Sequence, residues 1–179
     1  MRAVALVAHP DDCVIFAWPF IEAHPEFIWE IVYLTYRPND ARAREVTAYW
    51  QKRNVPVFFL GYNDTWLDMV REKISFDTVQ ATADINDIVD GVDLILTHHE
   101  DGDYGHIHHK FVNTAACQNG IPKVYFASTF NYNKEYHVHE PVDALELPLH
   151  RSVIEEFTDR NTGRYIVTPE AELIIKNNK

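Results

Sequence analysis

The sequence has few cysteines, few basic residues and no long hydrophobic run. Its two cysteines, Cys13 and Cys117, form no C-x-x-C pair and are too few for a disulfide framework, which indicates free thiols in a reducing compartment. The 16 Lys and Arg residues are outnumbered by 27 Asp and Glu residues, which gives a formal net charge of -11. A surface this acidic repels phosphate groups, so we expect no nucleic-acid partner and no membrane partner.

The N-terminal apolar run is only about six residues long, which is too short for a signal peptide. No stretch of the sequence reaches the roughly 20 apolar residues that a membrane span requires. We therefore expect a cytoplasmic protein. The 179 residues, 46% of them hydrophobic, suit one domain with its own core. We predict a single domain over residues 1–179 and leave the structure of the tail, 158–179, open.

Short apolar runs alternate with longer amphipathic segments along the chain. This alternation is typical of βαβ units, and it predicts a Rossmann-like three-layer α/β sandwich with a mostly parallel sheet of five or more strands. The expected strands are 3–8, 28–35, 55–60, 93–97 and 123–127. The expected helices are 11–23, 40–53, 76–89, 107–118 and 143–157. In the tail, 164–168 and 172–175 are candidates for short strands.

The first strand ends at His9-Pro10-Asp11-Asp12, which has the residue types of a metal site. In an open α/β sheet, ligands bind beyond the carboxyl ends of the strands, and these residues fall there. Pro10 keeps His9 out of helical geometry, so one tight turn can aim an imidazole and a carboxylate at one point. One aspartate could ligate zinc while the other takes a proton from metal-bound water. The alternative is that both aspartates only cap the next helix.

Five of the ten histidines fall between His98 and His109, directly after the fourth strand. In a doubly wound sheet this strand flanks the switch point together with the first, so the two clusters should meet. His106 and His109 share one helix face, whereas His108 should turn aside. One of the pair could complete a zinc site with three protein ligands, and the other could donate to an oxyanion or protonate a leaving amine. The alternative is an inert, solvated histidine-rich loop.

Other polar residues near the two clusters have weaker interpretations. His98 and His99 fit polar loop residues better than partners of a metal ligand. Asp103 looks like a turn former, although Asp103 or Tyr104 could contact a substrate. Cys13 has no base partner, so we do not expect a thiol nucleophile. Three residues beyond the fifth strand are further candidates for the cleft wall: Tyr132, His137 and His139.

The run Ala8-His9-Pro10-Asp11-Asp12, followed far downstream by Gly105-His106-Ile107-His108-His109, resembles the PIG-L/LmbE-like de-N-acetylase family. That family has an AHPDD motif after its first strand and an HPDH-like motif after its fourth. Arg42 and Glu45 fit its R-x-x-E motif. His150-Arg151-Ser152 is partly similar to its C-terminal H-x-S-Q motif. The resemblance covers about residues 1–155.

The resemblance implies a hydrolase with one zinc ion that removes an acetyl or other acyl group from an amino sugar, such as N-acetylglucosamine, or from its conjugate. Asp11 would be the base that activates the attacking water, and His106 would stabilise the oxyanion or act as an acid. Arg42 would touch the small-molecule substrate. Other divalent metals and a homo-oligomer stay open. The implied zinc ligands are His9, Asp12 and His109.

The chain departs from the family pattern near both motifs. Cys13 stands where the family usually has Glu, bulky residues over 14–20 replace glycines, and Ile107 and His108 replace Pro and Asp. The metal and base positions are intact, so these departures bear on the substrate rather than on the reaction. The alternative is a catalytically degenerate small-molecule- or sugar-binding module of the same fold, against which the retained Asp11 counts. No G-x-G-x-x-G follows the first strand, which argues against a nucleotide-binding domain.

Overall fold

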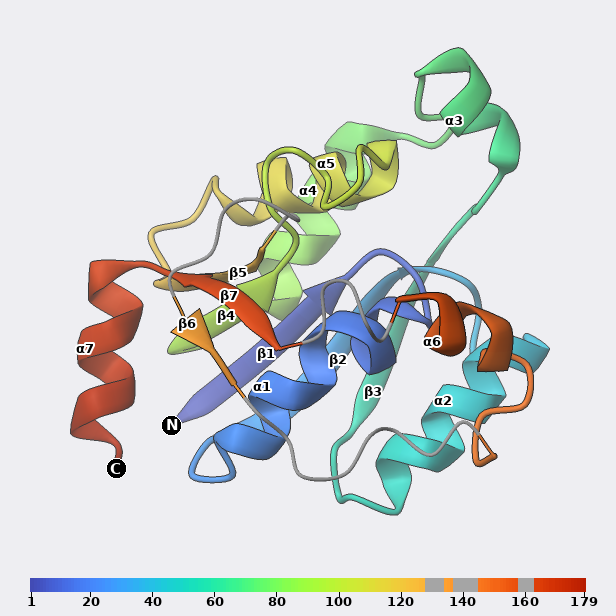
Figure 1. Ribbon diagram of the computed structural model, residues 1–179. Coiled ribbons are helices and arrows are strands. Elements are labelled where there is room, and N and C mark those ends of the chain that lie inside the picture. The colour runs from blue at the N-terminus through green and yellow to red at the C-terminus, as the bar shows by residue number, and fades with distance from the viewer. Residues whose placement is uncertain (128–133, 137–144, 158–162) are drawn as a thin grey trace.

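The computed structural model describes residues 1–127, 134–136, 145–157 and 163–179 (Figure 1). Within these residues a seven-stranded sheet has the order β3-β2-β1-β4-β5-β7-β6. Its parallel part consists of β3 (Val57–Tyr62), β2 (Ile28–Thr35), β1 (Arg2–Val7), β4 (Leu94–Thr97) and β5 (Lys123–Phe126). The strands β7 (Arg164–Val167) and β6 (Lys134–Glu135) extend one edge with antiparallel pairing. The predicted mostly parallel α/β sandwich is confirmed.

Helices cover both faces of the sheet, as Figure 1 shows. One face packs against the π-helical segment η1 (Cys13–Ala17) and against α1 (Trp18–Ala23), α2 (Ala41–Gln51), α6 (Arg151–Phe157) and α7 (Pro169–Asn177). The other face packs against α4 (Thr78–Ile88) and α5 (Ile107–Ala116). Successive residues of β1 alternate between these two cores, which explains why this strand is a continuous apolar run in the sequence.

Some predicted elements have different bounds or a different type. The predicted tail strand over 172–175 is wrong, because these residues belong to α7, which begins with Thr168 as its cap and a proline in its first turn. The predicted helix over 143–157 is helical only from Arg151; residues 145–150 form turns, and 143–144 lie outside the described residues. The short helix α3 (Trp66–Arg71) and the strand β6 had no predicted counterpart.

The pairing of β1 with β4 brings the two histidine-containing segments together. Leu6 of β1 is in register with Thr97 of β4, and the two strands are parallel. The segments that follow β1 and β4 therefore leave the sheet side by side, at the edge formed by the carboxyl ends of the parallel strands. There the backbone N–H of Ala8 donates to Nε2 of His98 at 3.0 Å, across 90 residues of sequence. β2 follows on one side of β1 and β4 lies on the other, so this edge is the switch point at which an open α/β sheet binds ligands.

Candidate metal centre

Three buried donor groups meet at this edge of the sheet: His9, Asp12 and His109. Nδ1 of His9 lies 3.2 Å from Nε2 of His109. Asp12 lies 3.3 Å from each ring, with Oδ2 nearest Nδ1 of His9 and Oδ1 nearest Nε2 of His109. Tetrahedral zinc with bonds of 2.0–2.1 Å holds its ligand atoms about 3.3 Å apart. The residues present therefore fit a zinc ion with three protein ligands and one open position.

The turn after β1 directs Asp12 into this cluster rather than onto the following helix. Its Oδ2 accepts the backbone N–H of His9 at 2.7 Å, and its side chain makes no cap hydrogen bond to η1. The capping alternative therefore does not describe Asp12. Burial alone would raise the pKa of this carboxyl group, but His109 and His98 hold the pKa well below its ordinary value. Asp12 is therefore an ionised donor.

Asp103 lies behind His109 and fixes the tautomer of its ring. Nδ1 of His109 donates to Oδ2 of Asp103 at 2.9 Å, which leaves Nε2 free to face Asp12. His98 also hydrogen-bonds Asp103 and stacks on His109 with ring centroids 3.8 Å apart. The side chain of Asp103 is fully buried, which does not fit the predicted contact with substrate. His98 is likewise a buried support of the site rather than a solvated loop residue.

The ring of His9 is held from its other side by His108. Nε2 of His9 and Nδ1 of His108 are 3.1 Å apart, and Nε2 of His108 lies 3.0 Å from Oδ2 of Asp68. Asp68 is itself fixed by the backbone N–H and the hydroxyl group of Ser75, each at 3.1 Å. With His108 donating to Asp68 and accepting from His9, Nδ1 of His9 is left unprotonated toward the zinc position. The prediction that His108 turns aside is therefore wrong.

Asp11, the predicted base, stands beside the three donors and pairs with Arg42, the predicted substrate contact. Oδ2 of Asp11 lies 3.1 Å from a terminal nitrogen of Arg42, whose other terminal nitrogen donates to the hydroxyl of Tyr36 at 3.3 Å. Among the described residues, Oδ1 of Asp11 and Nε of Arg42 are buried without a hydrogen-bond partner. The site therefore offers one free carboxylate acceptor and one free donor.

His106 caps the first turn of α5, and its Nδ1 accepts the backbone N–H of His108 at 3.2 Å. Burial, together with His9 and His109, lowers the pKa of His106 to about 3, so the ring is neutral and carries its proton on Nε2. The ring stacks on His109 with centroids 4.7 Å apart. Tyr104 is 51% exposed, with its ring 5.2 Å from that of His109. Its contact with substrate stays a prediction.

Cys13, which stands where the family usually has Glu, lies in the core. Cys13 is buried, and its sulfur contacts the Tyr33 hydroxyl at 2.6 Å and accepts from Nε1 of Trp50 at 3.0 Å. Burial raises the pKa of this thiol, which agrees with the absence of a thiolate nucleophile from the predicted site.

Glu45 accepts from Nδ1 of His150, which joins α2 to the start of α6. The predicted cleft residues Tyr132, His137 and His139 lie outside the described residues.

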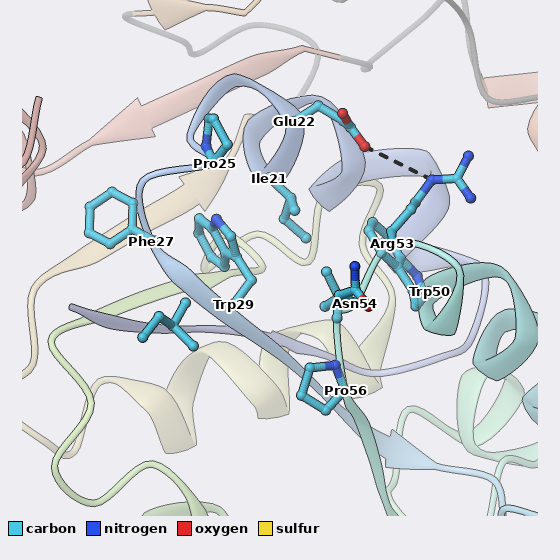
Figure 2. Close-up of a pocket in the computed structure, with 11 residues that line it drawn as sticks. Ile21, Glu22, Pro25, Phe27, Trp29, Trp50, Arg53, Asn54 and Pro56 are labelled. Atoms are coloured by element: carbon cyan, nitrogen blue, oxygen red, sulfur yellow. Dashed lines mark ion pairs between the residues drawn. The ribbon is translucent and has the colours of Figure 1, made fainter.

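A cavity of about 450 Å³ adjoins the metal cluster at the carboxyl ends of β2 and β3. Its lining is polar and aromatic: Tyr36, Arg37, Asp40, Gly61, Tyr62, Asn63 and Asp64. Asp64 links the cavity to the cluster, because its Oδ1 lies 3.6 Å from Nε2 of His9. A second cavity, of about 330 Å³, is lined by Trp29, Trp50 and the Glu22–Arg53 ion pair, and none of the metal-cluster residues line it (Figure 2).

A doubly wound α/β sheet thus carries, at its switch point, a histidine and aspartate donor set that can hold a metal ion. The family model described as GlcNAc-PI de-N-acetylase matches residues 4–119, and the chain belongs to this PIG-L family. No curated protein matches the sequence significantly. Within the described residues, no helix has both the length and the apolar character needed to cross a membrane.

Several solved structures share the fold. The chain resembles GalB, the 4-carboxy-2-hydroxymuconate hydratase from Pseudomonas putida, at 17% identity and a TM-score of 0.64, over 88% of this chain and 83% of that one. It also resembles the deacetylase of the teicoplanin biosynthesis pathway, at 14% identity and a TM-score of 0.57, over 88% and 84%. The zinc-inhibited form of teicoplanin deacetylase Orf2 matches at 13% identity and a TM-score of 0.53, over 88% and 84%. At these identities the likeness concerns the fold alone.

Proposed function

We propose that this chain is a zinc-dependent deacetylase that hydrolyses the N-acetyl amide of an amino sugar or of a sugar conjugate. One observation carries the proposal: Nδ1 of His9, Nε2 of His109 and the carboxylate of Asp12 converge at 3.2–3.3 Å. The hydrogen bonds to His108 and Asp103 engage the far nitrogen of each ring and so turn Nδ1 of His9 and Nε2 of His109 toward the donor set. Membership of the PIG-L family supports the amide as the bond that is cleaved.

Zinc bound by His9, Asp12 and His109 would supply Lewis acidity, which polarises the amide carbonyl and makes a water molecule more acidic. Asp11 is the candidate base for that water because its Oδ1 is an acceptor without a partner among the described residues. Arg42 holds the other carboxylate oxygen at 3.1 Å and thereby fixes the direction in which Oδ1 points. Asp11 therefore binds and orients the water and takes its proton.

His106 is the candidate donor to the oxyanion that forms on the amide carbonyl. It is neutral over the physiological pH range, and its Nε2–H is the remaining donor once Nδ1 has capped α5. A neutral donor that is already in place stabilises developing charge without having to reorganise. The adjoining polar cavity offers hydroxyl, carboxylate, guanidinium and amide groups, which suit the hydroxyl groups of a sugar.

The alternative, a catalytically degenerate binding module, explains the site less well. A binding module has no use for the free acceptor of Asp11 beside a metal site. It also has no use for His106 as a neutral hydrogen-bond donor. The bulky segment from Cys13 to Phe20 is buried in the core, so its departure from the family pattern does not fill the cavity beside Asp64. The first feature favours an enzyme, and the second leaves room for its substrate.

The decisive assay measures acetate release from N-acetylated sugars, glycopeptides and small amides. The protein is stripped with a chelator and then tested with and without one equivalent of zinc. We expect release from at least one sugar substrate that depends on zinc, and no release from the stripped protein. Zinc-independent release would overturn the metal-dependent mechanism. A protein that binds zinc but hydrolyses none of these amides would favour the binding module.

A further inference from the structure

A second set of metal-donor atoms lies on the side of the His9 ring that faces away from the proposed zinc site. It consists of Nε2 of His9, Nδ1 of His108 and Oδ1 of Asp64. The two ring nitrogens are 3.1 Å apart. Oδ1 of Asp64 lies 3.6 Å from Nε2 of His9 and 3.7 Å from Nδ1 of His108. His9 therefore presents one ring nitrogen to each of two donor sets.

The separations match the size of a transition-metal ion. A point about 2.0 Å from all three donor atoms satisfies them, and zinc binds histidine nitrogen and carboxylate oxygen at that distance. At 3.6 and 3.7 Å, the carboxylate of Asp64 is too far from either ring for a hydrogen bond. It stands at the spacing of a ligand around an ion rather than at the spacing of a hydrogen-bond partner.

The residues around this second set are arranged as supports of a metal ligand. Asp68 accepts from Nε2 of His108 at 3.0 Å, so the lone pair of His108 Nδ1 points toward His9 and Asp64. A carboxylate behind a histidine ring is the usual support of a metal-bound imidazole. The side chain of His108 is buried, whereas that of Asp64 is 30% exposed, which gives an ion access from the cavity.

We propose that His9, His108 and Asp64 form a second binding site for a divalent transition-metal ion, which fills when the metal exceeds one equivalent. The ring of His9 then bridges the two ions as an imidazolate. The proton that lay between His9 and His108 is released to solvent, and the ion forms bonds to Nε2 of His9, Nδ1 of His108 and Oδ1 of Asp64. No bond other than this N–H bond is broken in the side chains. The second ion binds more weakly than the first, because it must displace this proton and has only three protein donors.

An ion at this position would inhibit turnover. Asp64 is part of the wall of the 450 Å³ cavity that adjoins the proposed zinc site. An ion held there engages the carboxylate of Asp64, which is then no longer available to a substrate in the cavity. The inhibition rests on the proposed deacetylase function, whereas the binding of two ions does not.

The test is the metal stoichiometry of the full chain. Chelator-stripped protein is titrated with Co²⁺, which is followed by its visible absorption, and the ions retained at saturation are counted by mass spectrometry. We expect two ions per wild-type chain and one per Asp64→Asn chain. Asp87→Asn, an exposed aspartate of α4, is the matched control and should bind two ions. Circular dichroism checks that each variant is folded.

The bridging ring has a signature of its own. At two equivalents of Co²⁺, coupling through a shared imidazolate should weaken the paramagnetic resonance signal per ion, and Asp64→Asn should keep the full signal. In turnover assays, Asp64→Asn should raise the half-inhibiting zinc concentration at least about tenfold, in line with the loss of a metal-site residue.

The outcomes separate this inference from the proposed function. One ion per wild-type chain, or two per Asp64→Asn chain, overturns the second site and leaves the deacetylase proposal standing. No ion in the wild-type chain overturns both. Two ions without magnetic coupling overturn the shared His9 ring.

Discussion

Nδ1 of His109 donates a hydrogen bond of 2.9 Å to Oδ2 of Asp103, whose side chain is fully buried. The same carboxylate also binds His98, and together these rings hold the pKa of Asp103 at about 2 although burial opposes it. A negative charge at this position orients the ring of His109 and strengthens Nε2 as a donor to a metal. Asp103 thus acts on the site from behind, out of reach of a substrate.

Removing this charge should weaken metal binding without removing a ligand. Asp103→Asn retains an oxygen that can accept one hydrogen bond, but it loses the charge, so we expect zinc affinity to fall about 10- to 100-fold. Competition with a chromophoric chelator measures the change. Asp87→Asn serves as the control and should bind zinc as the wild type does. Equal affinity in Asp103→Asn would mean that the carboxylate only completes the core.

Asp11→Asn separates the base from the ligands. An amide has the size of the carboxylate but cannot take a proton from water, so acetate release should fall by roughly 10²- to 10⁴-fold. Zinc content should stay at the wild-type level because Asp12, rather than Asp11, lies within 3.3 Å of both ligand rings. Turnover that is unchanged in this variant would remove Asp11 from the role of base.

His106→Asn tests whether the capping histidine is an oxyanion donor or a fourth ligand. Donor atoms of His9, His106 and His109 also lie within 4.8 Å of one another, so ligation by His106 is geometrically open. Asparagine caps helices well, so α5 should survive the change. If His106 is a donor, its replacement should lower kcat about 10²- to 10³-fold and leave zinc affinity unchanged. A large drop in zinc affinity would instead make it a ligand.

The sequence predicted the sheet and the meeting of the two histidine-containing segments for a physical reason. Strands buried on both faces are continuous apolar runs, and the crossover rules of parallel sheets place the ends of β1 and β4 side by side. The sequence could therefore place His9, Asp12 and His109 together although about 100 residues separate the first from the last. The contact between His9 and His109 confirms this placement.

The supports of these residues were not predictable in the same way. Asp64 precedes α3 and Asp68 lies within it. This helix has only six residues, and its apolar residues Trp66 and Val70 are exposed, so its apolar pattern does not indicate which face is buried. Helical spacing led to the prediction that His108 turns away from the face shared by His106 and His109, but spacing cannot show which other element packs against His108. Tertiary packing decided its environment, and His108 is buried against Asp68 as a result.

Away from the metal cluster, His24 should make stability depend on pH. Burial lowers the pKa of His24 even though Glu26 lies 2.8 Å from its ring, so the ring is neutral in the fold. Below about pH 6.5 the unfolded chain takes up a proton that the folded chain does not. The free energy of unfolding is therefore not reduced by His24 above that pH. Below that pH, His24 lowers it by at most about 1.4 kcal/mol per pH unit.

Urea unfolding at pH 7.5 and pH 5.5 measures this effect. The loss of stability between the two pH values should be smaller in His24→Gln than in the wild type. An equal loss in both proteins would assign the pH dependence to other buried histidines.

The central claim is that zinc binds between His9, Asp12 and His109, and anomalous diffraction at the zinc edge tests it most directly. Crystals of protein loaded with one equivalent of zinc should show a single strong peak about 2.0–2.1 Å from Nδ1 of His9, Nε2 of His109 and a carboxylate oxygen of Asp12. A peak whose nearest donors exclude Asp12, or no peak at this edge of the sheet, would contradict the account.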